Sequence, residues 1–265
     1  MNLKPQILEL YNKTEFSNAD RKLFLEFRNG LNSGEIRAAE KIDDNWITNA
    51  WVKKGILVGF KMGSIVQLGN FLDKDTYPAQ NITNRKDLRL VPGGSSIREG
   101  SHIGKDVIMM PPMYINVGAY IDDGSMIDSH ALVGTCAQVG KNVHLSAASQ
   151  LGGVLEPISA NPVIIEDDVF IGGNCGIYEG VIIEQKAIIA AGVIITGGTP
   201  VFDAVKNEFL NKDDNGTLHI PERAVVVPGS RILKSNEEFS VYCPIIIKYR
   251  DAKSDRSVIL ENILR

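Results

Sequence analysis

Two carboxylates are the side chains of this sequence whose positions point most directly to chemistry. Asp128 follows Ile127 in the stretch MIDSHALVG, where comparable stretches of the chain carry residues such as Gly104 or Asn116. Glu179, in IYEG, stands two residues after Ile177, whereas Asp128 stands one residue after Ile127. A carboxylate at such a place is either simply solvated or able to hold an amine and accept its proton. The residues by themselves leave both interpretations open.

Metal and nucleophile chemistry is less well supported. His102, His130 and His144 fall in the middle of the chain. With about 18 residues per three-sided coil, His102 and His144 point to different sides and cannot converge on one ion. The three cysteines lack CxxC spacing, and no Ser-His-Asp order or nucleophile elbow occurs. We therefore expect no metal site, and the cysteines are typical of a reducing cytoplasm.

The composition excludes several classes of protein. The 265 residues carry a net charge of −4, which argues against a basic nucleic-acid-binding face. No apolar run approaches the roughly 20 residues that span a bilayer, and the start of the chain lacks the pattern of a secretory signal. We expect a cytoplasmic globular protein that binds neither nucleic acid nor membranes.

The elements that position these side chains follow from a six-residue repeat. Three residues after most of the repeating aliphatic positions stands Gly, Asn or Asp, which tolerate the left-handed backbone of a corner. Such units must stack to bury their aliphatic residue, which predicts a mainly β protein built as a hexapeptide parallel β-helix. An α-helix is excluded because a period of six would wind the aliphatic residues around it. The repeating positions are Val91, Ile97, Ile103, Met109, Ile115, Ile121, Ile127, Val133, Val139, Leu145, Leu151, Ile165, Ile171, Ile177, Ile183, Ile189 and Ile195.

Two interruptions and two flanks complete the predicted organisation. A loop insertion is expected near 152–164, where the 14 residues from Leu151 to Ile165 equal either two hexads plus two or one hexad plus eight. A second excursion is expected near 200–223. We predict a small α/β cap over residues 1–88, the β-helix over 89–230 and a C-terminal strand and helix over 231–265.

Local signals refine the flanks. The spacing of Leu23, Phe24, Phe27 and Leu31 before Gly34 predicts a helix near 19–32. Segments 46–51 and 55–60 mix helix and strand signals and stay unassigned. The remaining predictions are a hairpin or loop at 207–216, one more coil at 224–230, a strand at 242–249 and a helix at 257–265.

The sequence resembles the tetrahydrodipicolinate N-succinyltransferase family of the hexapeptide-repeat acyltransferases. The stretches that carry the resemblance are RLVPGGSSIREGSHIG, the long block from MMPPMYINVGAYIDDG to VFIGG, AVVVPGSR, and the flanking SGEIRAAEKIDDNWITNAWVKKGILVGF and SVYCPIIIKYRDAK. The resemblance implies a left-handed helix, a homotrimer with active sites between subunits, and transfer of a succinyl group from succinyl-CoA to tetrahydrodipicolinate in diaminopimelate and lysine biosynthesis. It also implies that Arg89 and Asp128 bind substrate.

One position departs from the family pattern. Many members carry a glutamate where this chain has Gly176, whereas Glu179 matches a family glutamate of its own. We therefore expect Asp128 and Glu179 as the catalytic carboxylates. Backbone N–H groups of Gly172, Gly192 and Gly198 are candidates to bind the acyl donor and its oxyanion.

We expect no tightly bound cofactor, with succinyl-CoA as a co-substrate whose phosphates meet lysines or arginines of the C-terminal third. Two alternatives stay open. One is another CoA-dependent acyltransferase, and the other is a non-enzymatic or metal-dependent β-helix protein.

Overall fold

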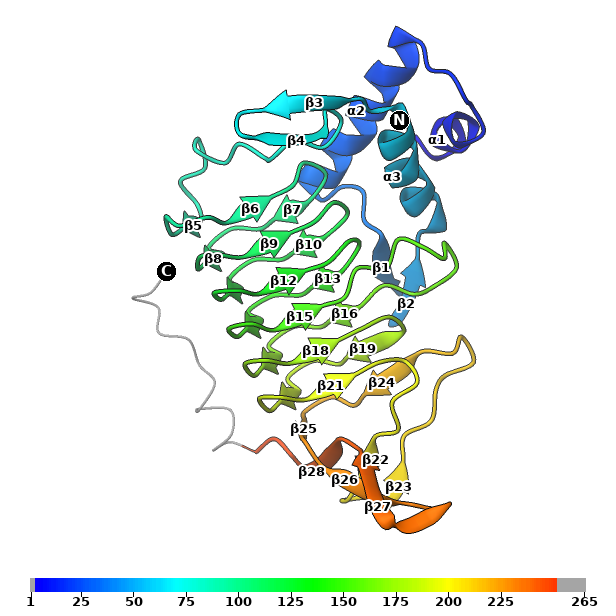
Figure 1. Cartoon of the computed structure of the whole chain (residues 1–265), viewed down its shortest axis with the longest axis vertical. Coiled ribbons are helices and arrows are strands. Elements are labelled where there is room, and N and C mark those ends of the chain that lie inside the picture. The colour runs from blue at the N-terminus through cyan, green and yellow to red at the C-terminus, as the bar shows by residue number, and fades with distance from the viewer. Residues whose placement is uncertain (1–2, 252–265) are drawn as a thin grey trace.

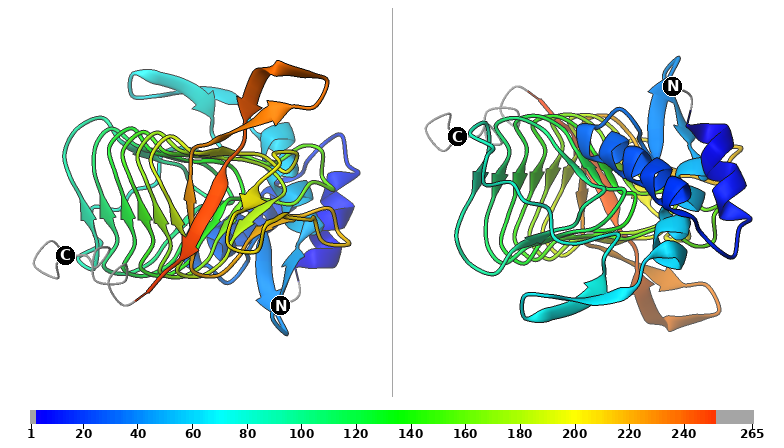
Figure 2. Two further views of the ribbon diagram at one scale, coloured as in Figure 1. Left: turned by 90° about the horizontal axis from the view of Figure 1, so that it is seen from below. Right: turned by 90° about the horizontal axis from the view of Figure 1, so that it is seen from above.

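The chain forms a long prism of stacked coils with helices at one end and β-hairpins at the other (Figure 1). The structure is a computed structural model that describes residues 3–251. Each coil contributes one short strand to each of three parallel sheets, as the view along the prism shows (Figure 2). The predicted mainly β, parallel β-helix architecture is confirmed.

The three sheets are faces 1, 2 and 3 of the prism, in the order in which the chain enters them. Face 1 contains β5 (Arg89–Leu90), β8 (Ile108–Met109), β11 (Met126–Ile127), β14 (His144–Leu145), β17 (Phe170–Ile171), β20 (Ile188–Ile189) and β25 (Ala224–Val227). Face 2 contains β6 (Ser96–Ile97), β9 (Tyr114–Ile115), β12 (Leu132–Val133), β15 (Gln150–Leu151), β18 (Gly176–Ile177) and β21 (Ile194–Ile195). Face 3 contains β7 (His102–Ile103), β10 (Tyr120–Ile121), β13 (Gln138–Val139), β16 (Ile164–Ile165), β19 (Val181–Ile183) and β24 (Leu218–Ile220).

The repeating aliphatic residues fill the interior of the prism. All of them except Val91 are at most 4% exposed. The residue three places later adopts a positive φ in nearly every coil, including at non-glycine positions such as Asp106, Asn142 and Lys186. Each six-residue unit therefore consists of a short strand with one inward side chain, followed by one corner with left-handed backbone.

The insertion between β15 and β16 leaves the order of the faces unchanged. β15 belongs to face 2 and pairs with β12, and β16 belongs to face 3 and pairs with β13. The 14-residue step is thus one ordinary hexad plus eight extra residues. This resolves the two alternatives that the spacing left open.

The N-terminal segment combines helices and hairpins. The predicted helix is confirmed as α2 (Asn18–Ser33), with Gly34 at its C-cap in the left-handed region. The unassigned stretch from 46 to 60 divides into the strand β2 (Asn45–Thr48), which pairs with β1 (Ala39–Ile42), and the helix α3 (Ala50–Met62). The other elements are α1 (Lys4–Tyr11), β3 (Ile65–Leu68) and β4 (Phe71–Lys74).

Removing the N-cap of α2 tests how firmly this segment is held. Ser17 Oγ accepts the N–H of Asp20 at 3.2 Å while the Asp20 carboxylate accepts the N–H of Ser17 at 2.9 Å. We expect Ser17→Ala to lower the free energy of unfolding by about 1 kcal/mol. Urea unfolding measures this, with the exposed Ser64→Ala as a control that changes stability by less than about 0.5 kcal/mol.

The C-terminal part closes the lower end of the prism. β25 pairs in parallel with β20, so the segment predicted as one more coil at 224–230 adds a further strand to face 1 before the chain enters the β26–β27 hairpin. β22 (Phe202–Asp203) and β23 (Glu208–Phe209) form an antiparallel pair within the predicted excursion. β28 (Ile245–Tyr249) confirms most of the predicted strand and follows the hairpin of β26 (Ser230–Leu233) and β27 (Asn236–Tyr242). The helix predicted at 257–265 lies outside the described residues.

Candidate active site

Asp128 stands at the edge of face 1, directly after β11. Its backbone N–H donates to the carbonyl of Leu145 at 2.9 Å, and its Oδ1 accepts the N–H of Ser129 at 3.1 Å. The side chain remains 27% exposed. The carboxylate is therefore anchored through one oxygen and accessible from outside the prism, as a group that accepts a proton from a ligand must be.

His144 lies beside Asp128, one coil farther along face 1. β14 pairs with β11 in the register that sets His144 against Met126, and His144 Nε2 is 3.7 Å from Asp128 Oδ2. Burial lowers the pKa of His144. His102 and His144 lie on different faces, as predicted. The hexad pattern alone did not indicate that one coil of 18 residues brings His144 under Met126 and so close to Asp128.

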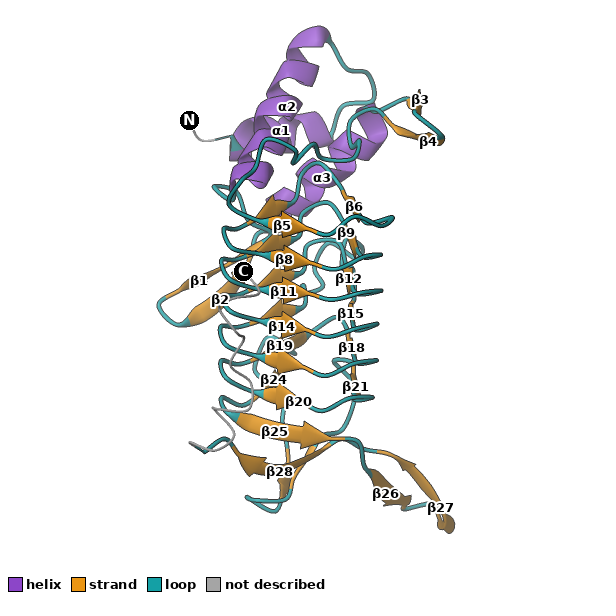
Figure 3. Ribbon diagram, turned by 90° about the vertical axis from the view of Figure 1, so that its left-hand side faces the viewer, coloured by secondary structure: helices purple, strands orange, loops and turns teal. Residues whose placement is uncertain are grey.

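Arg89 lies on the same face, at the upper end of the ladder in Figure 3. It pairs with Ile108, which pairs with Met126, so two strand spacings, or about 10 Å along the axis, separate its strand from β11. The arginine is exposed beside a cavity of about 250 Å³ that Lys86 also lines. Face 1 therefore presents a cationic side chain and a carboxylate along one line parallel to the prism axis.

Glu179 lies away from face 1, on which Arg89 and Asp128 lie. It follows β18 of face 2 and stands exposed at the corner that leads to face 3, two coils beyond the coil of Asp128. Its backbone carbonyl accepts the N–H of Gly197 at 3.0 Å. Within one chain, the two carboxylates expected to be catalytic stand at different corners of the prism and do not meet.

All three glycines proposed as oxyanion donors already donate their N–H groups in hydrogen bonds. Gly172 donates to the carbonyl of Ile189 at 2.7 Å, and Gly192 donates to that of Gly173 at 2.9 Å. These bonds belong to the stacking of the coils, so neither N–H is available for an oxyanion without breaking one. Gly198 instead donates to Thr196 Oγ1 at 3.2 Å and is exposed. Contact of these glycines with the acyl donor stays a prediction.

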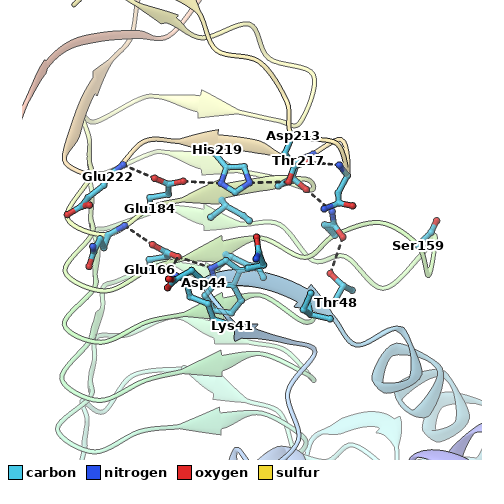
Figure 4. A pocket seen from close by; sticks show the side chains of 18 residues that line it. Lys41, Asp44, Thr48, Ser159, Glu166, Glu184, Asp213, Thr217, His219 and Glu222 are labelled. Atoms are coloured by element: carbon cyan, nitrogen blue, oxygen red, sulfur yellow. Dashed lines mark hydrogen bonds and ion pairs between the residues drawn. The ribbon is translucent and has the colours of Figure 1, made fainter. Parts of the chain in front are cut away.

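A larger cavity than the one beside Arg89 lies over face 3 (Figure 4). It measures about 750 Å³ and is walled by the β1–β2 hairpin, the insertion after β15 and the excursion that precedes β24. Hydrogen bonds join the three walls: Thr48 Oγ1 donates to Asn161 Oδ1 at 3.0 Å, and Asn161 Nδ2 donates to Thr217 Oγ1 at 2.8 Å. None of the predicted site residues lines this cavity.

A histidine bridges two of the cavity walls. His219 Nδ1 lies 3.0 Å from Glu184 Oε1 on face 3, and Nε2 lies 3.3 Å from Asp213 Oδ2 in the excursion. The hydrogen bond to Glu184 raises the pKa of His219 above its ordinary value of 6.5, and the same bond lowers the pKa of Glu184. The imidazole thus ties the excursion to the prism.

This bridge predicts a pH dependence of stability. A histidine pKa raised by folding gives stabilisation that is complete below the unfolded value and is lost as the pH rises through the folded value. We expect the unfolding temperature of the wild type to fall between pH 6 and pH 8.5 by more than that of His219→Gln, which keeps a polar side chain without a titrating charge. Equal falls in the two proteins would contradict the assignment.

Residues 3–251 contain neither a metal-binding cluster nor a membrane-spanning helix. No group of three or more His, Cys, Asp or Glu side chains there is arranged to hold a metal ion. Within the same range, no helix has the length and apolar character needed to cross a membrane. Cys136, Cys175 and Cys243 are buried and unpaired.

Comparison with known proteins decides the family. A model described as "Tetrahydrodipicolinate N-succinyltransferase N-terminal" matches residues 2–62, and one described as "Hexapeptide repeat of succinyl-transferase" matches residues 162–197. A 2,3,4,5-tetrahydropyridine-2,6-dicarboxylate N-succinyltransferase of Acinetobacter baylyi is 41% identical over 96% of this chain and 94% of its own. The protein of the same name from Idiomarina loihiensis is 36% identical over 100% and 98%. The chain belongs to the tetrahydrodipicolinate N-succinyltransferase family.

The space beside Gly176, the position expected to depart from the family pattern, is occupied by the side chain of Tyr178. Gly176 is buried on face 2, and a Cβ added there would lie 2.6 Å from Tyr178 Cε2. The Tyr178 hydroxyl in turn donates to Gln150 Oε1 at 3.1 Å. A larger side chain at 176 therefore requires the tyrosine ring to move.

Proposed function

We propose that this protein transfers a succinyl group from succinyl-CoA to tetrahydrodipicolinate, giving N-succinyl-2-amino-6-oxopimelate and CoA. The observation that carries the proposal is identity near 40% to N-succinyltransferases over almost the whole of both chains. The accessible Asp128 and the exposed Arg89 on one face of the prism supply groups that such a reaction needs. Succinyl-CoA acts as a co-substrate, and the reaction belongs to the cytoplasm.

The residues of face 1 divide the chemistry between them. Arg89 pairs with a carboxylate of the acceptor, because a guanidinium binds a carboxylate through two parallel hydrogen bonds. After hydration and ring opening of the acceptor, its nitrogen adds to the thioester carbonyl and its proton passes to Asp128. The C–S bond then breaks, and the sulfur of CoA leaves and takes up a proton.

We further propose a left-handed helix and a homotrimer with active sites between neighbouring copies. Face 3 is covered by the chain itself: Arg37 lies over the Tyr120 ring at 3.7 Å and donates to Gln138 Oε1 at 3.1 Å. Asp128 and Glu179 stand at the two edges of face 2, so a ligand that contacts both carboxylates needs a second copy. The groove between copies would hold the pantetheine arm of the acyl donor.

Thiol release tests the reaction. Purified protein is incubated with tetrahydrodipicolinate and either succinyl-CoA or acetyl-CoA, and free CoA is titrated with a thiol reagent. Release that requires both succinyl-CoA and tetrahydrodipicolinate supports the proposal. Release with other donors or amines instead would indicate another acyltransferase, and no release with any pair would indicate a non-enzymatic protein.

Subunit mixing tests the shared site. The variants Asp128→Asn and Glu179→Gln, each expected to be inactive by itself, are purified separately. They are then mixed, dissociated in mild denaturant and allowed to reassociate. If one copy supplies Asp128 and its neighbour supplies Glu179, some reassembled sites contain both native carboxylates and activity returns. Light scattering gives the mass, for which three copies are expected, and mixed trimers without activity would contradict the shared site.

A further inference from the structure

An imidazole nitrogen next to Asp128 is buried and lacks a hydrogen-bond partner. His144 Nε2 has almost no accessible surface and forms no hydrogen bond in the structure, although the side chain as a whole is 20% exposed. A buried polar atom without a partner is costly, by about 1–3 kcal/mol. The polar side-chain atom that faces this nitrogen is Asp128 Oδ2, at 3.7 Å.

The imidazole ring is held in this place by the stacking of the coils. β14 lies between β11 and β17, so His144 is flanked by Met126 and Phe170 on the outer surface of face 1. The Phe170 ring meets the imidazole edge-on, with centroids 5.0 Å apart and planes at 77°. Burial lowers the pKa of His144, so the ring is neutral at neutral pH and has one nitrogen that donates and one that accepts.

We propose that His144 is a positioning residue for Asp128. In the tautomer protonated at Nε2, the ring donates to Asp128 Oδ2 once the carboxylate closes the remaining gap, while the N–H of Ser129 holds Oδ1. Both oxygens are then fixed, and the lone pairs that remain point to the outside of face 1, where the acceptor nitrogen binds. This inference rests on the proposed function of Asp128.

The His144 nitrogen that faces Asp128 does not itself take the proton of the substrate. The nitrogen that faces Asp128 is shielded from solvent, so a substrate cannot reach it. Its effect therefore acts through the orientation of the carboxylate, which is required for turnover but not for the binding of substrate. A change at His144 should lower kcat and leave KM nearly unchanged.

Two substitutions separate the hydrogen bond from the packing. His144→Phe keeps an aromatic ring against Phe170 but removes the donor, and we expect it to lower kcat by about 10- to 100-fold, the size of one hydrogen bond to a charged group. His144→Gln places an amide N–H near the position of Nε2, and we expect kcat within about fivefold of the wild type. KM for both substrates should stay within about threefold in each variant.

His102→Gln is the matched control. His102 occupies the same hexad position on face 3, where it stacks on Tyr120 at 4.6 Å and lies away from Asp128. We expect this variant to alter thermal stability and to leave kcat within about twofold.

Equal losses of kcat in His144→Phe and His144→Gln, or wild-type kcat in His144→Phe, would overturn the inference. A wild type that releases no CoA would instead contradict the proposed function itself, so the two failures are distinguishable.

Discussion

Asp128→Asn is expected to lower kcat by about 10²- to 10⁴-fold. The amide has the shape of the carboxylate and can still accept the N–H of Ser129 through its oxygen, but it cannot take the proton of the attacking nitrogen. The free energy of unfolding should stay close to that of the wild type because the side chain is partly exposed and its anchoring bond is kept. CoA release under saturating substrates measures the effect.

Asp123→Asn provides the matched control for this substitution. Asp123 is exposed at another corner, and its Oδ1 likewise accepts a backbone N–H, that of Lys105 at 2.7 Å. We expect its kcat to remain within about twofold of the wild type. Turnover of Asp128→Asn equal to that of this control would remove Asp128 from the mechanism.

Leu145→Ala is expected to lower the free energy of unfolding by about 2–5 kcal/mol. Leu145 has no exposed surface and lies between Ile127 and Ile171 in the interior column of face 1. The strand pairing above and below holds the backbone in place, so the cavity left by the leucine cannot readily collapse. Urea unfolding followed by circular dichroism measures the change.

An exposed leucine gives the comparison for the core substitution. Leu72 of β4 is 75% exposed, and Leu72→Ala should change the free energy of unfolding by less than about 0.5 kcal/mol. If Leu145→Ala were as stable as Leu72→Ala, the hexad aliphatic residues would not be the source of the stability of the prism.

The regular part of the fold was predictable because it depends on short-range rules. One buried aliphatic side chain and one left-handed corner every six residues specify the strand, the bend and the stacking together. Another local signal, the helical spacing of apolar residues before Gly34, located α2, and Gly34 is indeed its C-cap. The segment from 46 to 60 resisted assignment because its division into β2 and α3 depends on packing against other parts of the chain.

The site was predictable only in part. Asp128 was proposed because a carboxylate is unusual at its place in the hexad, and Arg89 was proposed from the family resemblance. His144 carried no such signal, although its position next to Asp128 follows from the 18-residue coil once the faces are aligned. The hydrogen bonds that the N–H groups of Gly172 and Gly192 make between coils cannot be seen in the hexad pattern.

The amino-acid sequence by itself determined the β-helix, the inward residues and the family, because a repeat of six and a long run of matching residues are properties of the chain. The tertiary structure alone decided which residues of different coils touch. It set His144 against Asp128, separated Glu179 from both, and built a cavity over face 3 from three distant segments. The physical reason is that the length of each insertion and the register of the stacked strands control these contacts, and neither can be read from the local pattern.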